Sequence, residues 1–179
     1  ISFLEQNPQS IKAPLAHFQL ARIYYKKKRY KNAIDEFEKT DVYYLKNDEV
    51  TEYYFKTGYG YFAKKEFDKA GKQFAQIINV DSKYKTAAQY YYAHVAYENN
   101  NYKTALEGFD KLKDSETFGP LIPFYVVQIY FEQDKHDELL NYAIHVLKHD
   151  KVQHKTEIKR FIAEDYFKNR QQKKEINFF

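Results

Sequence analysis

The sequence predicts an all-α fold in which antiparallel pairs of helices stack along the chain. Apolar and aromatic residues return at intervals of three and four, and no segment alternates as a half-buried strand would. The 179 residues include only five Gly and four Pro, which leaves long segments uninterrupted. A residue pattern also recurs at a spacing that is typical of stacked helical repeats rather than of one closed domain.

The recurring pattern has five positions: a small residue, an aromatic three places later, another aromatic six further on, then Ala three on and Phe four on. Its three best copies are Ala21, Tyr24, Tyr30, Ala33, Phe37; Gly58, Tyr61, Phe67, Ala70, Phe74; and Ala93, Ala96, Tyr102, Ala105, Phe109. Two weaker copies are Val127, Tyr130, His136, Leu139, Ala143; and Ala163, Tyr166, Gln172, Glu175, Phe179. The period is 37 residues from Ala33 to Ala70 and 35 residues from Ala70 to Ala105.

The pattern assigns two helices to each repeat. The first helices are expected near 14–27, 50–64, 83–99, 120–133 and 155–168, and the second helices near 30–44, 67–79, 102–114 and 136–149. A further helix is expected from about Gln172. Pro14 and Pro120 suit the first turn of a helix, and Asp81-Ser82 offers a cap before the helix expected near 83–99. The turns within pairs are short and polar, as antiparallel neighbours require.

These residues resemble the tetratricopeptide repeat (TPR) family, whose unit is two antiparallel helices of about 34 residues. The resemblance covers residues 9–179, although the tryptophan of the family is absent. It implies a right-handed superhelical solenoid with about four full repeats and partial repeats at both ends. We expect a single array, cut from a longer protein: the end of a preceding repeat at 1–9, full repeats at 10–46, 47–81, 82–117 and 118–152, and an incomplete repeat at 153–179.

In the architecture that the resemblance implies, the first helices line a concave face. Residues three before, one after and four after the small position then share one exposed stripe. In the first four repeats these residues are Phe18, Arg22, Tyr25, Phe55, Tyr59, Phe62, Tyr90, His94, Tyr97, Phe124, Gln128 and Phe131, and in the last they are Arg160, Glu164 and Phe167. Nine of the first twelve are aromatic, so the stripe suits a peptide or helix of another protein.

Composition limits the classes of function. The net charge of +4, from 29 basic and 25 acidic residues, argues against a dedicated nucleic-acid binder. Because the chain has no Cys, it has no disulfides, thiolate metal sites or cysteine nucleophiles. No apolar stretch reaches the roughly 18 to 20 residues of a membrane span. The sequence fixes neither the compartment, which can be the cytoplasm or a bacterial periplasm or cell envelope, nor the oligomeric state.

Three local motifs suggest other chemistry, and in each case a structural explanation is stronger. The string from Gly58 to Ala63 matches the dinucleotide fingerprint G-x-G-x-x-A, but it falls inside an expected helix rather than after a strand. His145 and His149, with His154, could hold a metal, but their spacing also fits a solvated helix surface. The basic run 26–31 ends a helix, where the dipole favours positive charge.

We therefore expect a non-catalytic protein-interaction scaffold with no cofactor and no metal, which binds a partner peptide or helix in a concave aromatic groove. The alternative is a structural segment in which the stripe is filled by packing, on the chain's own repeats or on another copy, through ends such as Ile1–Phe3 and Phe178–Phe179. A narrower form of the scaffold hypothesis is an assembly factor of the bacterial cell envelope, by analogy of fold.

The small residues of the pattern are expected to act as spacers that let neighbouring helices approach. Replacing Ala70 by Leu should therefore lower the free energy of unfolding by about 1–3 kcal/mol through overpacking. A thermal melt measures this loss, and an unchanged midpoint would contradict the spacer role.

Overall fold

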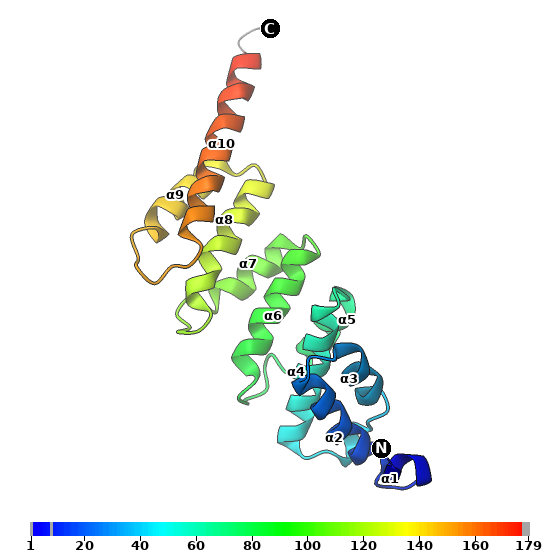
Figure 1. Cartoon of the computed structure of the whole chain (residues 1–179). Coiled ribbons are helices and arrows are strands. Elements are labelled where there is room, and N and C mark those ends of the chain that lie inside the picture. The colour runs from blue at the N-terminus through cyan, green and yellow to red at the C-terminus, as the bar shows by residue number, and fades with distance from the viewer. Residues whose placement is uncertain (1, 8, 177–179) are drawn as a thin grey trace. The chain divides into compact units, whose positions relative to one another are not determined.

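The structure of the chain is a computed structural model that describes residues 2–7 and 9–176. Within these residues the chain is all-helical and contains no strand, which confirms the predicted fold class (Figure 1). In chain order the elements are α1 (Ser2–Gln6), α2 (Ala13–Lys26), α3 (Tyr30–Phe37), the 3₁₀ helix η1 (Val42–Tyr44), α4 (Asn47–Ala63), α5 (Phe67–Ala75), α6 (Lys85–Glu98), α7 (Tyr102–Asp110), the 3₁₀ helix η2 (Gly119–Leu121), α8 (Ile122–Glu132), α9 (His136–Val146) and α10 (Lys155–Ile176).

Contacts divide the chain into two compact units, the first ending at Asn101 and the second beginning at Tyr102. In the first unit α2 packs on α3, α3 on α4, α4 on α5 and α5 on α6. In the second unit α8 packs on α7, α9 and α10, and α9 also packs on α10. Each expected repeat between residues 10 and 152 contains one pair of helices, and the unit boundary falls in the turn of the third pair.

In the first three pairs the second helix is shorter than expected, because the backbone tightens directly after the buried Phe of the pattern. The carbonyl oxygens of Phe37, Phe74 and Phe109 each accept a hydrogen bond from the backbone N–H three residues later, at 2.9–3.0 Å. Such bonds belong to a 3₁₀ turn, which commonly ends an α-helix. The Thr40 hydroxyl adds to the first of these ends by donating to the Glu36 carbonyl oxygen at 3.1 Å.

The further helix that was expected from Gln172 is not separate, and that prediction was wrong. Helix α10 runs without interruption from Lys155 to Ile176. Residues 168–175 are mostly Lys, Gln, Arg and Glu, which favour helix and contain no Gly or Pro to stop it. The expected apolar ends at Ile1 and at Phe178–Phe179 lie outside the described residues, as does the last position of the fifth copy of the pattern.

In the first three copies of the pattern the closing Phe is a fully buried core residue. Phe37, Phe74 and Phe109 have no exposed surface, and Ala33, Ala70 and Ala105 are buried beside them in sequence. At Gly58 an added Cβ would lie 2.9 Å from Cε1 of Phe74, which is closer than real Cβ contacts. The small positions of the pattern are therefore the places where a ring of one helix meets the backbone of another.

The second unit encloses a core of its own. Val127 of α8, Leu139 and Ala143 of α9, and Ile158 and Phe161 of α10 form one buried cluster. Helix α10 is also tied to α9 by a contact between the buried Asp165 carboxylate and Nδ1 of His136. The last described helix is thus fastened to its neighbours from Ile158 to Asp165, within its first three turns.

The turns between the helices of a pair share a left-handed residue that is not glycine. In the first turn Lys28 has a φ of 56°, its N–H donates to the Tyr25 carbonyl at 2.9 Å, and the Arg29 N–H donates to the Tyr24 carbonyl at 3.0 Å. This is the Schellman arrangement that closes a helix. The same φ sign and the same two bonds recur at Lys65, Asn100 and Asp134. The four turns therefore share a left-handed backbone conformation, although the residue that adopts it is Lys, Asn or Asp.

Replacing Lys28 by Gly should raise the free energy of unfolding by roughly 0.5–1 kcal/mol. A left-handed conformation costs an L-residue about 1–2 kcal/mol, and glycine avoids this cost. Glycine also loses more backbone entropy on folding, which offsets about 0.5–1 kcal/mol of the stabilisation. The neighbouring Lys27 has an ordinary φ of −83° and serves as the matched control. Lys27→Gly should lower the melting midpoint, and equal shifts in both variants would contradict the explanation.

Candidate functional site

The expected aromatic stripe contains rings at two depths. Tyr25, Phe55, Tyr59 and Phe62 are half-buried, whereas the closing Phe rings of the second helices are fully buried. Phe18 and Tyr90 do not follow the expectation of an exposed stripe, because they have only 0% and 5% of their surface exposed. At these two positions the exposed stripe that the sequence predicts is wrong.

The burial of Phe18 has a geometric reason. The residue three places before the small position faces the closing Phe of its own pair, so the ring centroids of Phe18 and Phe37 lie 6.1 Å apart. The equivalent Phe55 lies 6.0 Å from Phe74, but it also reaches Tyr84 at 4.9 Å and remains half-buried. This position of the stripe therefore belongs mainly to the core.

Tyr59 of α4 is the centre of a continuous cluster of rings in the first unit. Its ring centroid lies 5.1–6.4 Å from those of Tyr25, Tyr30, Phe55, Phe62 and Tyr91. Phe62 extends the cluster to Tyr91 at 5.1 Å and to His94 at 5.0 Å. The structure thus brings the expected residues of α2, α4 and α6 together. Tyr91 was missed, because it lies outside the three stripe positions of its repeat.

A buried carboxylate joins α2 and α4 electrostatically. Glu52 of α4 is 6% exposed, and its Oε1 lies 2.8 Å from Nε of Arg22 and 2.5 Å from Nζ of Lys56. Nζ of Lys56 in turn lies 5.2 Å from the ring centroid of Tyr25, a cation–π geometry. Arg22 was expected as a polar contact for a guest, and the structure shows that it already holds Glu52.

Burial shifts the pKa of two stripe residues. It raises the pKa of Tyr25, and the neighbouring Tyr59 and Tyr30 hydroxyls act in the same direction, so Tyr25 stays a neutral hydroxyl. Burial lowers the pKa of His94, although the carboxylate of Glu98, 3.3 Å from Nε2, opposes the shift. Both shifts favour the uncharged form of the ring, so Arg22 is the cation of the stripe in α2 and its partner is Glu52.

The stripe residues of the second unit form a separate set. Phe131 lies 5.1 Å and Phe124 6.1 Å from the ring of Phe161, and these two half-buried rings pack against the buried cluster that contains Phe161. Gln128 is half-buried on the same helix. In α10, Arg160 pairs with Glu164 at 3.4 Å, and Phe167 remains largely exposed.

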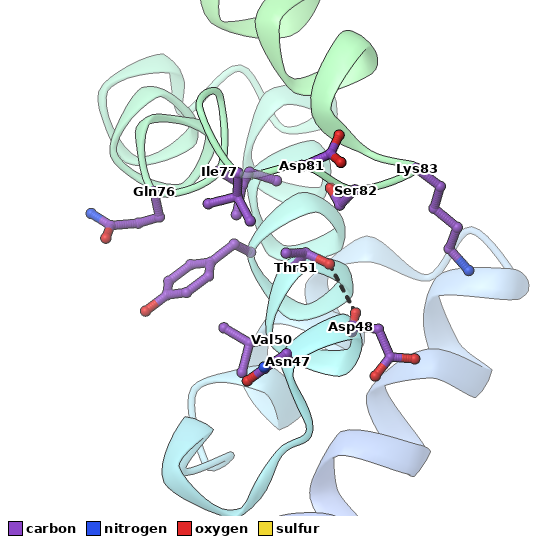
Figure 2. Close-up of a pocket in the computed structure, with 11 residues that line it drawn as sticks. Asn47, Asp48, Val50, Thr51, Gln76, Ile77, Asp81, Ser82 and Lys83 are labelled. Carbon is purple, nitrogen blue, oxygen red and sulfur yellow. Dashed lines mark hydrogen bonds between the residues drawn. The ribbon is translucent and has the colours of Figure 1, made fainter.

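A pocket that the sequence does not predict opens at the N-terminal end of α4. It has a volume of about 660 Å³ and lies between the first turns of α4 and the connection from α5 to α6 (Figure 2). Val50, Tyr54, Ile77 and Val80 supply its apolar walls, and Asp48, Asp81 and Lys83 its charges. Thr51 lies within it, with its hydroxyl donating to the Asp48 carbonyl at 2.9 Å.

Known structures with a similar backbone identify the fold. Two crystal structures described as the nearly identical TPR-like repeats of a kinesin light chain from Podosopora anserina superpose on this chain with TM-scores of 0.64 and 0.63. The chain has a TPR-like repeat fold. Each of the two structures is 13% identical in sequence to this chain. The match covers 92% of this chain and 92% of the first structure, and 93% of this chain and 91% of the second. No protein-family model matches the sequence, and the search of curated proteins found no match.

The TPR-like fold explains the motifs that suggested other chemistry. Gly58, Gly60 and Ala63 lie inside α4, and no strand precedes them in the described part of the chain, so the string does not occupy the strand-to-helix turn in which the dinucleotide fingerprint works. The rings of His145 and His149 lie 5.3 Å apart, but α9 ends at Val146, before His149. The described residues include no group of three or more His, Asp or Glu that could hold a metal ion. None of the described helices is long and apolar enough for a membrane span.

Replacing Glu52 by Gln should lower the free energy of unfolding by about 1–3 kcal/mol. The substitution removes the charge that compensates Arg22 and Lys56, and breaking a buried charge pair leaves the remaining partners poorly solvated. Glu107→Gln, at an exposed position of α7, is the control and should change the urea midpoint little. Equal midpoints for the two variants would show that Glu52 does not hold α2 to α4.

Proposed function

We propose that the chain is a non-catalytic protein-interaction scaffold that binds a peptide or helix of another protein. The proposed contact is the aromatic surface, defined as Tyr25, Phe55, Tyr59, Phe62 and Tyr91 of α2, α4 and α6. His94 and Tyr97 of α6 are further contacts of the same kind. In the second unit, Phe124, Gln128 and Phe131 occupy the equivalent positions, and we propose them as contacts of the same class.

One contrast within the first unit supports this proposal. The rings of the second helices, Phe37 and Phe74, are fully buried, whereas those of the aromatic surface keep part of their area exposed. Exposed tyrosine and phenylalanine edges supply large contact area with little loss of side-chain freedom, and such residues dominate protein-binding hot spots. TPR-like repeats also offer an extended surface built by successive helices.

A second candidate function is purely structural, and a different observation favours it. Tyr59 is surrounded by rings of its own unit, and Phe18 and Tyr90 are buried. In this case the stripe is filled by the chain itself, and its rings serve stability alone. The two candidates differ in what the loss of one ring changes: binding and stability separately, or stability alone.

The test compares two tyrosines of the same cluster. Tyr25 and Tyr30 contact each other at 5.8 Å and both contact Tyr59, but only Tyr25 belongs to the proposed surface. A photoreactive phenylalanine analogue at position 25 first identifies the partner by cross-linking and mass spectrometry. The dissociation constant of that partner should then rise at least tenfold in Tyr25→Ala, a loss of about 1.4 kcal/mol, as expected for a hot spot.

Tyr30→Ala is the matched control, because it removes the same side chain from the same cluster. Thermal melts should show comparable losses of stability in both variants, and binding is measured where both are folded. Equal weakening by the two variants, or no cross-linked partner, would support the structural candidate and contradict the proposed function.

A further inference from the structure

The pocket at the beginning of α4 has the size and walls of a binding site. Its volume of about 660 Å³ falls within the 300–1,000 Å³ that is common for ligand pockets. Val50 and Tyr54 of α4 face Ile77 and Val80 of the α5–α6 connection across it. Val80 is 42% exposed at its edge. An apolar side chain that entered the pocket would therefore contact aliphatic and aromatic groups on two sides.

The charges at the pocket are unequal. The carboxylates of Asp48 and Asp81 are exposed, and neither forms an ion pair with any residue that the structure describes. Lys83 is the one cation among the lining residues, and its Nζ lies 5.1 Å from the ring centroid of Tyr84. Figure 2 shows the side chains of Lys83 and Asp48 both directed away from Val50 and Ile77, and with Asp81 the lining has one carboxylate in excess. The pocket thus presents negative charge beside an apolar wall.

We infer that this pocket is a docking site for a peptide segment of a partner protein in which an apolar side chain stands next to Lys or Arg. The apolar side chain enters between Val50, Tyr54 and Val80, and the cation pairs with Asp48 or Asp81. An acidic segment is disfavoured by these two carboxylates, so charge decides the occupant.

Two exposed rings that come shortly before the pocket residues in the sequence favour an extended peptide over a small molecule. Tyr43 and Tyr44 of η1 lie four and three residues before Asn47, which lines the pocket, and they are 85% and 43% exposed. Their rings contact each other at 5.5 Å. Because they directly precede α4 in the chain, we expect a peptide that continues past the pocket to contact them, which a small ligand would not do.

The pocket is distinct from the aromatic surface. Tyr54 and Phe55 are neighbours in sequence, and consecutive residues of an α-helix point about 100° apart. Tyr54 lines the pocket, whereas Phe55 belongs to the ring cluster around Tyr59. Helix α4 therefore carries two different recognition surfaces on two of its sides, and each can be altered without the other.

The test uses two fluorescein-labelled synthetic peptides, one of alternating leucine and arginine and one of alternating leucine and glutamate. Fluorescence anisotropy with the whole chain should show at least tenfold tighter binding of the arginine peptide. Asp48→Asn combined with Asp81→Asn should remove most of that preference. Amide signals of Thr51 and Val80 should shift in ¹⁵N-resolved NMR spectra when the arginine peptide is added.

The matched control is Asp35→Asn combined with Asp137→Asn, two exposed aspartates outside the pocket, which changes the net charge equally. It should leave peptide binding unchanged, and Tyr25→Ala should do the same. Equal effects of the two double variants would show non-specific attraction and overturn the proposal. Self-association in sedimentation that Asp48→Asn/Asp81→Asn abolishes would also overturn it, because the basic segment 26–31 of a second copy would then be the occupant.

Discussion

The contact between a phenylalanine ring of one helix and the backbone of another, at a position where the side chain is absent or a single methyl, underlies the architecture of this chain. Phe74 lies so close to Gly58 that no Cβ fits between them, and Ala70 is buried beside it. Close packing of this kind has little tolerance in volume, since interiors are as dense as organic crystals. The five-position pattern recurs because each pair of helices must satisfy the same geometric condition.

That condition also determines which rings remain available for recognition. Once the closing Phe fills the space within a pair, the aromatic residues of the first helices pack on one another at the sides of the core, half-buried around Tyr59. Glu52 completes this layer by holding Arg22 and Lys56. A surface so constructed is rigid, because its rings have neighbours on several sides, and rigid aromatic surfaces lose little entropy on binding.

The fold could be predicted from the sequence because its signals are local and periodic. Ala33, Ala70 and Ala105, with the Phe four residues after each, fix the helix pairs and their spacing. The ends of the helices were harder, since the tightened turns after Phe37 and Phe74 depend on backbone hydrogen bonds that no residue type signals. Helix α10 passes the expected break, where Arg170 stands at the position of the left-handed residue and the sequence from 168 to 175 is mostly strong helix formers.

The candidate sites were only partly predictable, for a related reason. Helical spacing correctly groups Tyr25, Tyr59 and Phe62, but spacing alone does not show that Phe18 turns towards Phe37 or that Arg22 reaches a carboxylate from the next pair. The pocket is built by residues about 30 positions apart, at the start of α4 and after α5, which no single stretch of sequence brings together. Contacts between pairs, rather than within them, decide these features.

At the left-handed turns of Lys28, Lys65, Asn100 and Asp134, a substitution can change the stability of the fold without changing the surfaces proposed to bind a partner. These residues are exposed, and none belongs to the ring cluster or the pocket. A protein evolving a new partner can accept disruptive changes among its rings and recover the lost stability at such a turn. Substitutions in the turns that join its helices can thus compensate for destabilising changes in the binding surfaces on those helices.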